Sequence, residues 1–263
     1  QALNGNNGQL TLKNGKLQLT VSSHGGYVSG AKIMGFKDIK GDNDLTLFAG
    51  NEQKLNFMLA GKQTNIVTAD LFFTPSNHTD STLTLTAEAA NGGQLVINYR
   101  LGQNYLVNMQ VQAKGLDGIF APNYNKVDIE WEGLCRQQEK GFTFENRYAT
   151  LTYKEKNDDS DYINETEKVT DEPMEFAIDW LAFKDQFFSS VLIPKGDIAP
   201  NSQLSSIPQE KGSGYLKQYI AKFKTDFDPT GAVPTELEMY FGPNDFQVLK
   251  DVDDECSFDK DLD

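Results

Sequence analysis

The sequence predicts an all-β protein, a sandwich or barrel of many short, mainly antiparallel strands. Segments in which apolar and polar residues alternate recur about every 8–12 residues, and clusters of turn-forming residues separate them. Glycine, asparagine and threonine are plentiful, as expected for a chain with many turns. A helical hydrophobic period is sustained nowhere except in a short segment near the end of the chain. These three observations favour two large sheets packed face to face, with one short helix.

The length is consistent with one such unit. The chain has 263 residues, and all-β units of about 200–250 residues often form a single domain. We find no internal repeat and no clear boundary. We therefore expect one domain over residues 1–263, with the sandwich in 1–241 and a helix and acidic tail in 242–263.

The net charge of −14 at pH 7 argues against two classes of partner. Nucleic-acid binding requires clusters of lysine and arginine, and so does adsorption to an anionic membrane through basic residues. We recognise no signal peptide and no transmembrane segment. Both ends resemble cuts through a longer protein, so we expect segments outside this sequence to matter for its function.

The first half of the chain shows the strand pattern most clearly. Residues 9–12 and 17–21 alternate strictly, and Asn14-Gly15 between them predicts a tight hairpin turn, because both residues tolerate positive φ. A second turn at residues 23–26 leads into a strand at 27–34. Further strands are predicted at residues 55–59, 66–73, 83–88, 95–101 and 105–113.

The most apolar and aromatic stretch is residues 176–194, which we expect to form the central hairpin of a large sheet. Its two apolar runs, 176–183 and 187–193, flank the polar Lys184-Asp185-Gln186, which makes the stretch too broken for a membrane span. Periodicity alone does not distinguish these strands from a helix, so a helix is the alternative for this stretch. Four aromatic residues are expected to organise the core, with partner binding as the alternative: Trp180, Phe183, Phe187 and Phe188.

The remaining elements are predicted with the same reasoning. Strands are expected at residues 127–131, 142–153, 215–224 and 237–241. The acidic segment 154–172 and the polar segment 195–214 are expected to be hydrophilic connections. Pro243 with Asp245 predicts the first turn of a closing amphipathic helix that carries Phe246 and Leu249 on one side.

Residues that carry chemistry are scarce. His24 and His78 both lie in turn-like segments, and we assign neither a catalytic role. Cys135 and Cys256 have no metal or redox spacing and are expected to be unpaired. Clustered metal ligands and phosphate-binding glycine loops are also lacking, so we expect no catalytic residue, metal or cofactor. A pair of carboxylates that hydrolyses glycosides stays a possible alternative, because the sequence does not give the distance between two carboxyl groups.

Four stretches in order resemble one known family, the periplasmic domain of YidC-type membrane protein insertases. The last two are the more specific. The stretches are LQLTVSSHGG at 17–26 with VSGA at 28–31, residues 95–101 with 105–111, WLAFKDQFF at 180–188 continuing to Ile193-Pro194, and YFGPNDF at 240–246 with Leu249-Lys250. The sequence departs from the family pattern at Asn244, where lysine is usual, and in the acidic segment 154–172.

The resemblance implies a β-supersandwich related to galactose mutarotases, held in the periplasm and tethered to the bacterial inner membrane. The hydrophobic insertase core would lie outside this chain. It also implies a non-catalytic role in insertion and folding of membrane proteins, through contact with accessory subunits of the Sec translocon or with nascent substrate segments. Edge strands or a cleft between the sheets would supply such contacts.

Within this interpretation the closing helix is expected to pack on the sandwich near the membrane, and its candidate contact residues are Phe246, Leu249 and Lys250. The main alternative is a mutarotase-like sugar-binding protein or an aldose epimerase. An epimerase would need a histidine acid and a carboxylate base that converge in one cleft. A third alternative is a spacer without a specific partner.

Overall fold

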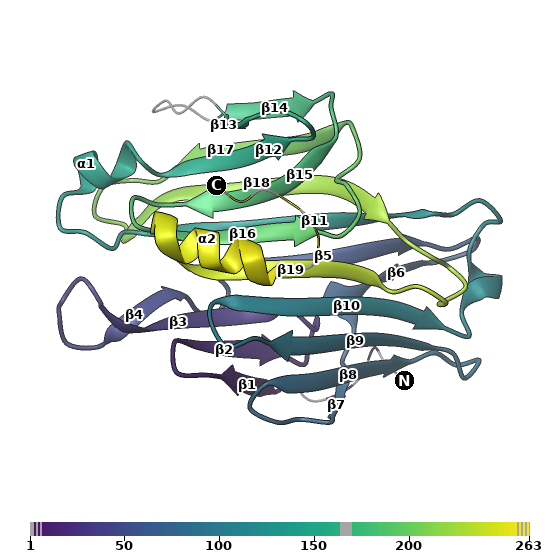
Figure 1. Ribbon diagram of the computed structural model, residues 1–263. Helices are drawn as coiled ribbons and strands as arrows, with labels where there is room; N and C mark the ends of the chain where they lie inside the picture. Colours follow the sequence, from purple (N-terminus) through teal and green to yellow (C-terminus); the bar gives the residue numbers. More distant parts are fainter. Residues whose placement is uncertain are drawn as a thin grey trace.

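Three antiparallel sheets of nine, six and four strands make up most of the protein (Figure 1). The computed structural model describes residues 3, 5, 7–163, 170–256, 258, 260 and 262, and only the backbone of Phe246. Strands predominate throughout these residues. The predicted all-β class is therefore confirmed.

The nine-stranded sheet has the order β13-β12-β15-β16-β19-β10-β9-β8-β7. Its strands are β7 (Thr74–Ser76), β8 (Thr82–Glu88), β9 (Gln94–Leu101), β10 (Leu106–Lys114), β12 (Thr150–Glu155), β13 (Ser160–Tyr162), β15 (Ile178–Lys184), β16 (Phe188–Pro194) and β19 (Thr235–Pro243). The hairpin predicted at residues 176–194 is β15 and β16, which pair directly, with β19 on the far side of β16. It therefore lies near the middle of the largest sheet.

The other two sheets are smaller. The six-stranded sheet has the order β14-β17-β18-β11-β5-β6, and the four-stranded sheet runs β1-β2-β3-β4. Their strands are β1 (Gln9–Lys13), β2 (Leu17–Ser22), β3 (Val28–Lys37), β4 (Asp44–Phe48), β5 (Gln53–Ala60), β6 (Asn65–Val67), β11 (Lys126–Arg136), β14 (Thr170–Met174), β17 (Ser202–Pro208) and β18 (Tyr215–Asp226).

Both smaller sheets pack against the nine-stranded sheet and form a second layer. Trp131 of β11 stacks on Phe183 of β15, with ring centroids 3.6 Å apart. Phe48 of β4 meets Phe241 of β19 edge to face at 5.3 Å. The buried side chains between the layers form one continuous core. The second layer buries one face of the central strand β16, and burial of all its residues requires a cover on the opposite face as well.

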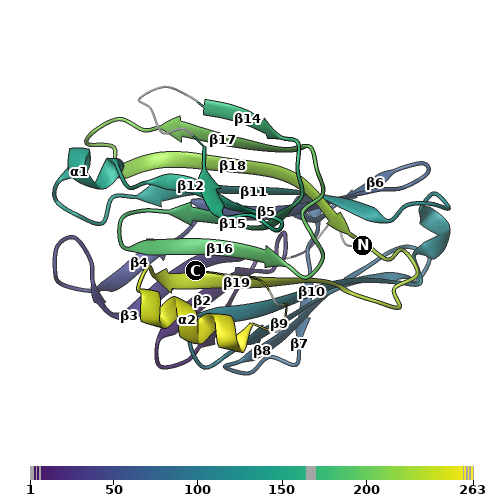
Figure 2. The ribbon, with the colours of Figure 1, turned by 45° about the horizontal axis from the view of Figure 1, so that its top comes forward.

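One helix covers part of the opposite face of the nine-stranded sheet. This helix, α2 (Phe246–Glu255), lies beside β19 in both views (Figures 1 and 2). Val252 is buried, and Val248 and Leu249 pack against the core from half-buried positions. Among the described residues, no helix has the length and apolar character required to cross a bilayer.

Several local predictions need correction. The turn after β1 forms where expected, but without positive φ at Asn14 or Gly15. Instead the Asn14 side-chain oxygen accepts hydrogen bonds from the backbone N–H groups of Lys16 and Leu17, both at 2.8 Å, so the asparagine closes the turn through its side chain. Pro243 is the last residue of β19, and α2 begins three residues later.

Other segments differ in type from the prediction. Residues 142–153 contain the short helix α1 (Phe142–Asn146) before β12, and residues 66–73 contain a 3₁₀ turn at Thr68–Asp70 after β6. The polar segment 195–214 contains β17, and the acidic segment contributes β13 and β14. These two strands are edges of different sheets, the nine-stranded and the six-stranded.

Candidate interaction surface

The turn between β15 and β16 is bonded directly to the start of α2. The backbone N–H of Asn244 donates to the carbonyl of Phe187 at 2.7 Å. Its side-chain amide donates to the carbonyls of Asp185 at 3.2 Å and Phe188 at 3.4 Å, and the Ser189 hydroxyl donates to its oxygen. Asn244 therefore joins the two elements that sequence analysis singled out, the central hairpin and the closing helix.

A buried carboxylate holds the same turn from inside. Asp185 is buried, and its Oδ1 accepts hydrogen bonds from the backbone N–H of Phe187 at 2.9 Å and of Phe188 at 2.7 Å. Desolvation raises the pKa of this carboxyl to about 7, although the two hydrogen bonds favour its ionised form. The turn is thus fixed by both Asp185 and Asn244.

The four aromatic residues expected in the core do not share one environment. Trp180, Phe183 and Phe188 are buried, whereas Phe187 is 48% exposed. The expectation for Phe187 was wrong because the residue belongs to the turn and not to β16, which begins at Phe188. Its side chain therefore projects beyond the end of the sheet.

Phe187 belongs to a group of exposed apolar side chains that the sequence did not reveal as one group. We call this group the loop-end surface, because its members lie on or beside the β3–β4 loop, α1, β13 and the β15–β16 turn. They are 38–54% exposed: Phe36, Ile39, Phe144, Tyr148, Tyr162 and Phe187. The described residues expose only two other large hydrophobic side chains to this degree, Leu3 and Val233. Exposed apolar groups concentrated at one place indicate an interaction site.

The predicted contact residues of the closing helix have different positions. Leu249 is half-buried against the core and Lys250 is exposed. The side chain of Phe246 lies outside the described part of the chain. Asp245 caps the helix by accepting a hydrogen bond from the N–H of Val248 at 3.1 Å. Within the described helix, Lys250 is thus the predicted residue most open to a partner.

An ion-pair network holds the segment after α2 on the sheet. The side chain of Lys260 is 7% exposed, and its Nζ lies 3.1 Å from Asp179 and 3.0 Å from Asp197. Lys154 also pairs with Asp179, at 3.3 Å, and Lys156 pairs with Asp197. Three lysines therefore share two aspartates, which links residue 260 to the middle of the chain.

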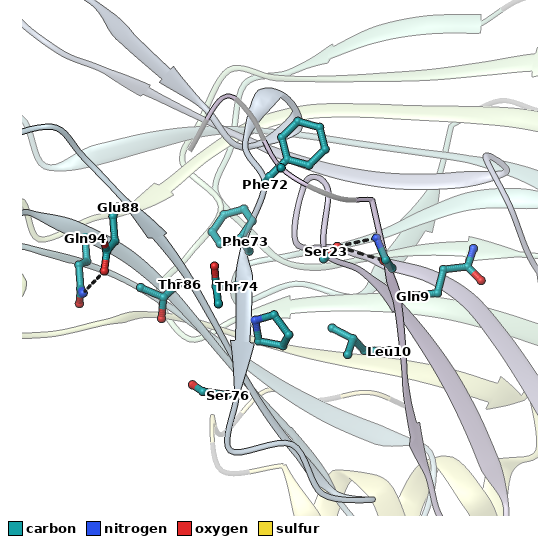
Figure 3. Close-up of a pocket in the computed structure, with 13 residues that line it drawn as sticks. Gln9, Leu10, Ser23, Phe72, Phe73, Thr74, Ser76, Thr86, Glu88 and Gln94 are labelled. Atoms are coloured by element: carbon teal, nitrogen blue, oxygen red, sulfur yellow. Dashed lines mark hydrogen bonds between the residues drawn. The ribbon is translucent and has the colours of Figure 1, made fainter. Parts of the chain in front are cut away.

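A hollow of about 730 Å³ lies on another part of the molecule, between the edge strands β1 and β7 (Figure 3). Phe72, Phe73 and Ser23 line it, and Glu88 is the only titratable side chain among the described lining residues. The Glu88 carboxylate accepts a hydrogen bond from the Gln94 amide at 3.4 Å. A single exposed carboxylate supplies no acid–base pair.

Neither histidine lines this hollow. The ring of His24 stacks on Phe72 with centroids 4.0 Å apart, and Nε2 of His78 lies 2.9 Å from the carbonyl of Thr11. Both rings are therefore engaged in contacts between chain segments. Within the described residues, no three histidine, cysteine or acidic side chains are placed to hold a metal ion, and Cys135 and Cys256 are not disulfide-bonded.

The bonding around Asn244 leads to a testable prediction. Replacing Asn244 with alanine removes the amide contacts and leaves two carbonyls and a hydroxyl of the hairpin without these partners. We expect the free energy of unfolding to fall by about 1–3 kcal/mol, measured by urea denaturation. Asn244→Asp is the informative control, because it keeps the acceptor for Ser189 but loses both donors. Equal stability of Asn244→Ala and the wild type would contradict this role.

Comparison with solved structures defines the class of fold. A galactose mutarotase related enzyme from Lactobacillus acidophilus aligns over 89% of this chain and 97% of its own, with a TM-score of 0.52 and 11% identity. A galactose mutarotase-like protein from Lactobacillus casei aligns over 90% and 100%, with a TM-score of 0.52 and 13% identity. The protein is therefore a galactose mutarotase-like β-supersandwich.

Sequence comparison gives the family. The family model for the YidC periplasmic domain matches residues 9–263, so the chain belongs to this family. Proteins named membrane protein insertase YidC are 44% identical in Phocaeicola vulgatus and 37% identical in Bacteroides fragilis, over 96% and 92% of this chain. The chain spans about two-fifths of the length of these curated relatives, since the matches cover 40% and 39% of them. The resemblance found in the sequence is confirmed.

Proposed function

We propose that this chain is the non-catalytic periplasmic module of a membrane protein insertase, tethered to the inner membrane through parts of the protein outside this sequence. The match to the YidC periplasmic domain over residues 9–263 carries this proposal. We further propose that residues 1–263 act as one domain. The module aids insertion and folding of membrane proteins by contact with accessory subunits of the Sec translocon or with nascent substrate segments.

The structure supports a contact function at two places. The loop-end surface presents aromatic rings in a fixed arrangement, because Asp185 and Asn244 hold the turn that carries Phe187. Among the described strands, β13 and β14 are each the last strand of a sheet, and an extended segment can add to such a sheet edge.

Site-directed photo-crosslinking in the full-length protein tests this function. A crosslinking residue at position 187 or 250 is expected to capture a Sec accessory subunit or a nascent membrane protein, whereas one at exposed Val233 serves as the control. Deletion of residues 9–263 is expected to slow membrane insertion of dependent substrates. Unchanged insertion after the deletion, with no adducts from positions 187 or 250, would instead support a spacer.

The sugar-epimerase alternative is less well supported. Its similarity to this chain lies in the fold, and the described hollow offers Glu88 without a histidine partner. Titration with galactose and glucose, followed by an assay of anomer interconversion, separates the two functions. Activity that disappears in His24→Ala or His78→Ala would contradict the proposed contact function.

A further inference from the structure

We propose that the loop-end surface rests on the head-group region of a phospholipid bilayer. The inference goes beyond the proposed function but uses one part of it, the attachment of the module close to a membrane. It assigns the exposed aromatic side chains to lipid, with Phe144 of α1 and Phe187 of the β15–β16 turn as the central contacts.

The side chains of this surface come together at one end of the molecule. The β3–β4 loop, α1 and the β15–β16 turn lie at the same end in both views (Figures 1 and 2). Ile39, Phe144 and Phe187 line one hollow of about 510 Å³. Tyr148 and Tyr162 line a neighbouring hollow of about 690 Å³, and Gln186 borders both. Protruding tips at one end fit a planar partner better than a groove along the sheet does.

The tips are held rigidly, so their exposure is built into the fold. Phe187 is fixed through Asp185 and Asn244, as described above. In α1, the fully buried Glu145 accepts hydrogen bonds from the backbone N–H groups of Gln138 and Glu139, at 3.0 and 3.1 Å. The rings of Phe144 and Tyr148 lie 5.3 Å apart. A pre-ordered apolar surface loses little conformational entropy when it binds.

The charge around these tips is compatible with lipid head groups, although the whole chain is acidic. The two hollows are lined by four basic residues, Lys37, Lys140, Arg147 and Lys184, and by four acidic ones, Asp38, Glu139, Asp161 and the buried Asp185. The charged residues that line the two hollows are therefore balanced, so repulsion from anionic lipid is weaker here than the net charge of −14 would suggest. Aromatic rings beside lysine and arginine are typical of membrane–water interfaces.

A second copy of the chain is a less suitable occupant. Two loop-end surfaces facing each other bring together two strongly acidic bodies, and their balanced charges provide no complementary attraction. We therefore assign lipid as the occupant and treat self-association as an outcome of the test.

Vesicle flotation with residues 1–263 tests the proposal. The vesicles contain phosphatidylethanolamine and phosphatidylglycerol in a 3:1 ratio. We expect half of the protein to float at lipid concentrations on the order of 1 mM, weak binding that suffices for a tethered module. Replacing both Phe144 and Phe187 with serine is expected to lower the partition coefficient about tenfold. The matched control is Val233→Ser, which removes an exposed apolar side chain that lines neither hollow.

The outcomes separate the possibilities. Urea denaturation of each variant verifies folding, and we expect little change because all three side chains are exposed. No flotation of the wild type, or equal flotation of the double variant and Val233→Ser, overturns the proposal. So does a dimer in sedimentation velocity that the double variant alone abolishes. Photo-crosslinking from position 250, which lines neither hollow, does not depend on these results, so failure here leaves the insertase function to that test.

Discussion

Replacing Phe183 with alanine is expected to lower the free energy of unfolding by about 3–5 kcal/mol, because it opens a cavity between the two layers of the sandwich. The ring stacks on Trp131 of the opposing sheet and lies 5.2 Å from the ring of Tyr219. The backbone of β11 on the opposing sheet also lies close to the Phe183 ring. A Cβ atom at Gly133 would lie 3.0 Å from the Phe183 ring, so glycine leaves just enough space for it.

The matched control is Phe187→Ala, four residues along the same hairpin. This side chain is 48% exposed, so its removal is expected to cost less than about 1 kcal/mol. Equilibrium urea denaturation followed by circular dichroism measures both variants. Similar losses for the two substitutions would contradict the different environments of these phenylalanines.

Much of the fold could be predicted because the relevant signals are local. In β8, Leu83, Leu85 and Ala87 are buried while the threonines between them are half-exposed, which is the alternation that the sequence displays. The continuous apolar runs of β15 and β16 similarly indicate strands covered on both faces. Residue pattern determines strand type directly in such cases.

Other elements depend on distant partners and lack a local signal. The serine-rich strand β17 has little apolar character, and its ladder with β18 defines it as a strand. Helix α1 was mistaken for a strand because its phenylalanines favour strands, whereas the buried Glu145 ties this segment to residues 138–139.

The candidate surface was the least predictable feature. Ile39 and Phe144 are more than 100 residues apart in the sequence. Only the fold brings them, together with Phe187, to one hollow. One signal was available in advance: Asn244 stands where the family usually has lysine. An asparagine both donates and accepts hydrogen bonds, as the pairing with the hairpin turn requires.

The second large effect concerns pH. Desolvation raises the pKa of Asp185 and of Glu238 to about 7 in the folded protein. The folded state therefore holds protons that the unfolded state has lost between about pH 4 and 7, so stability falls as the pH rises through this interval. From pH 5 to pH 8 we expect the free energy of unfolding to decrease by about 2–4 kcal/mol, unlike the usual acid destabilisation of carboxylate-rich proteins.

Asp185→Asn identifies the contribution of this residue. The asparagine oxygen keeps the acceptor for the N–H groups of Phe187 and Phe188, while the buried charge is removed. The variant is therefore expected to match the wild type at pH 5 and to be more stable at pH 8, by about 1–3 kcal/mol. Glu238→Gln is expected to remove the rest of the dependence, because it likewise retains an oxygen for the Asn108 amide.

Urea denaturation of the wild type, both single variants and the double variant at pH 5, 6, 7 and 8 measures these contributions. The double variant should show a much smaller difference in stability between pH 5 and pH 8, since it lacks both carboxyls whose pKa burial raises to about 7. A wild type whose stability rises toward pH 8 would mean that the folded protein binds fewer protons than the unfolded chain. In that case the two N–H donors stabilise the Asp185 carboxylate by more than desolvation destabilises it. The turn would then hold an ionised group at neutral pH.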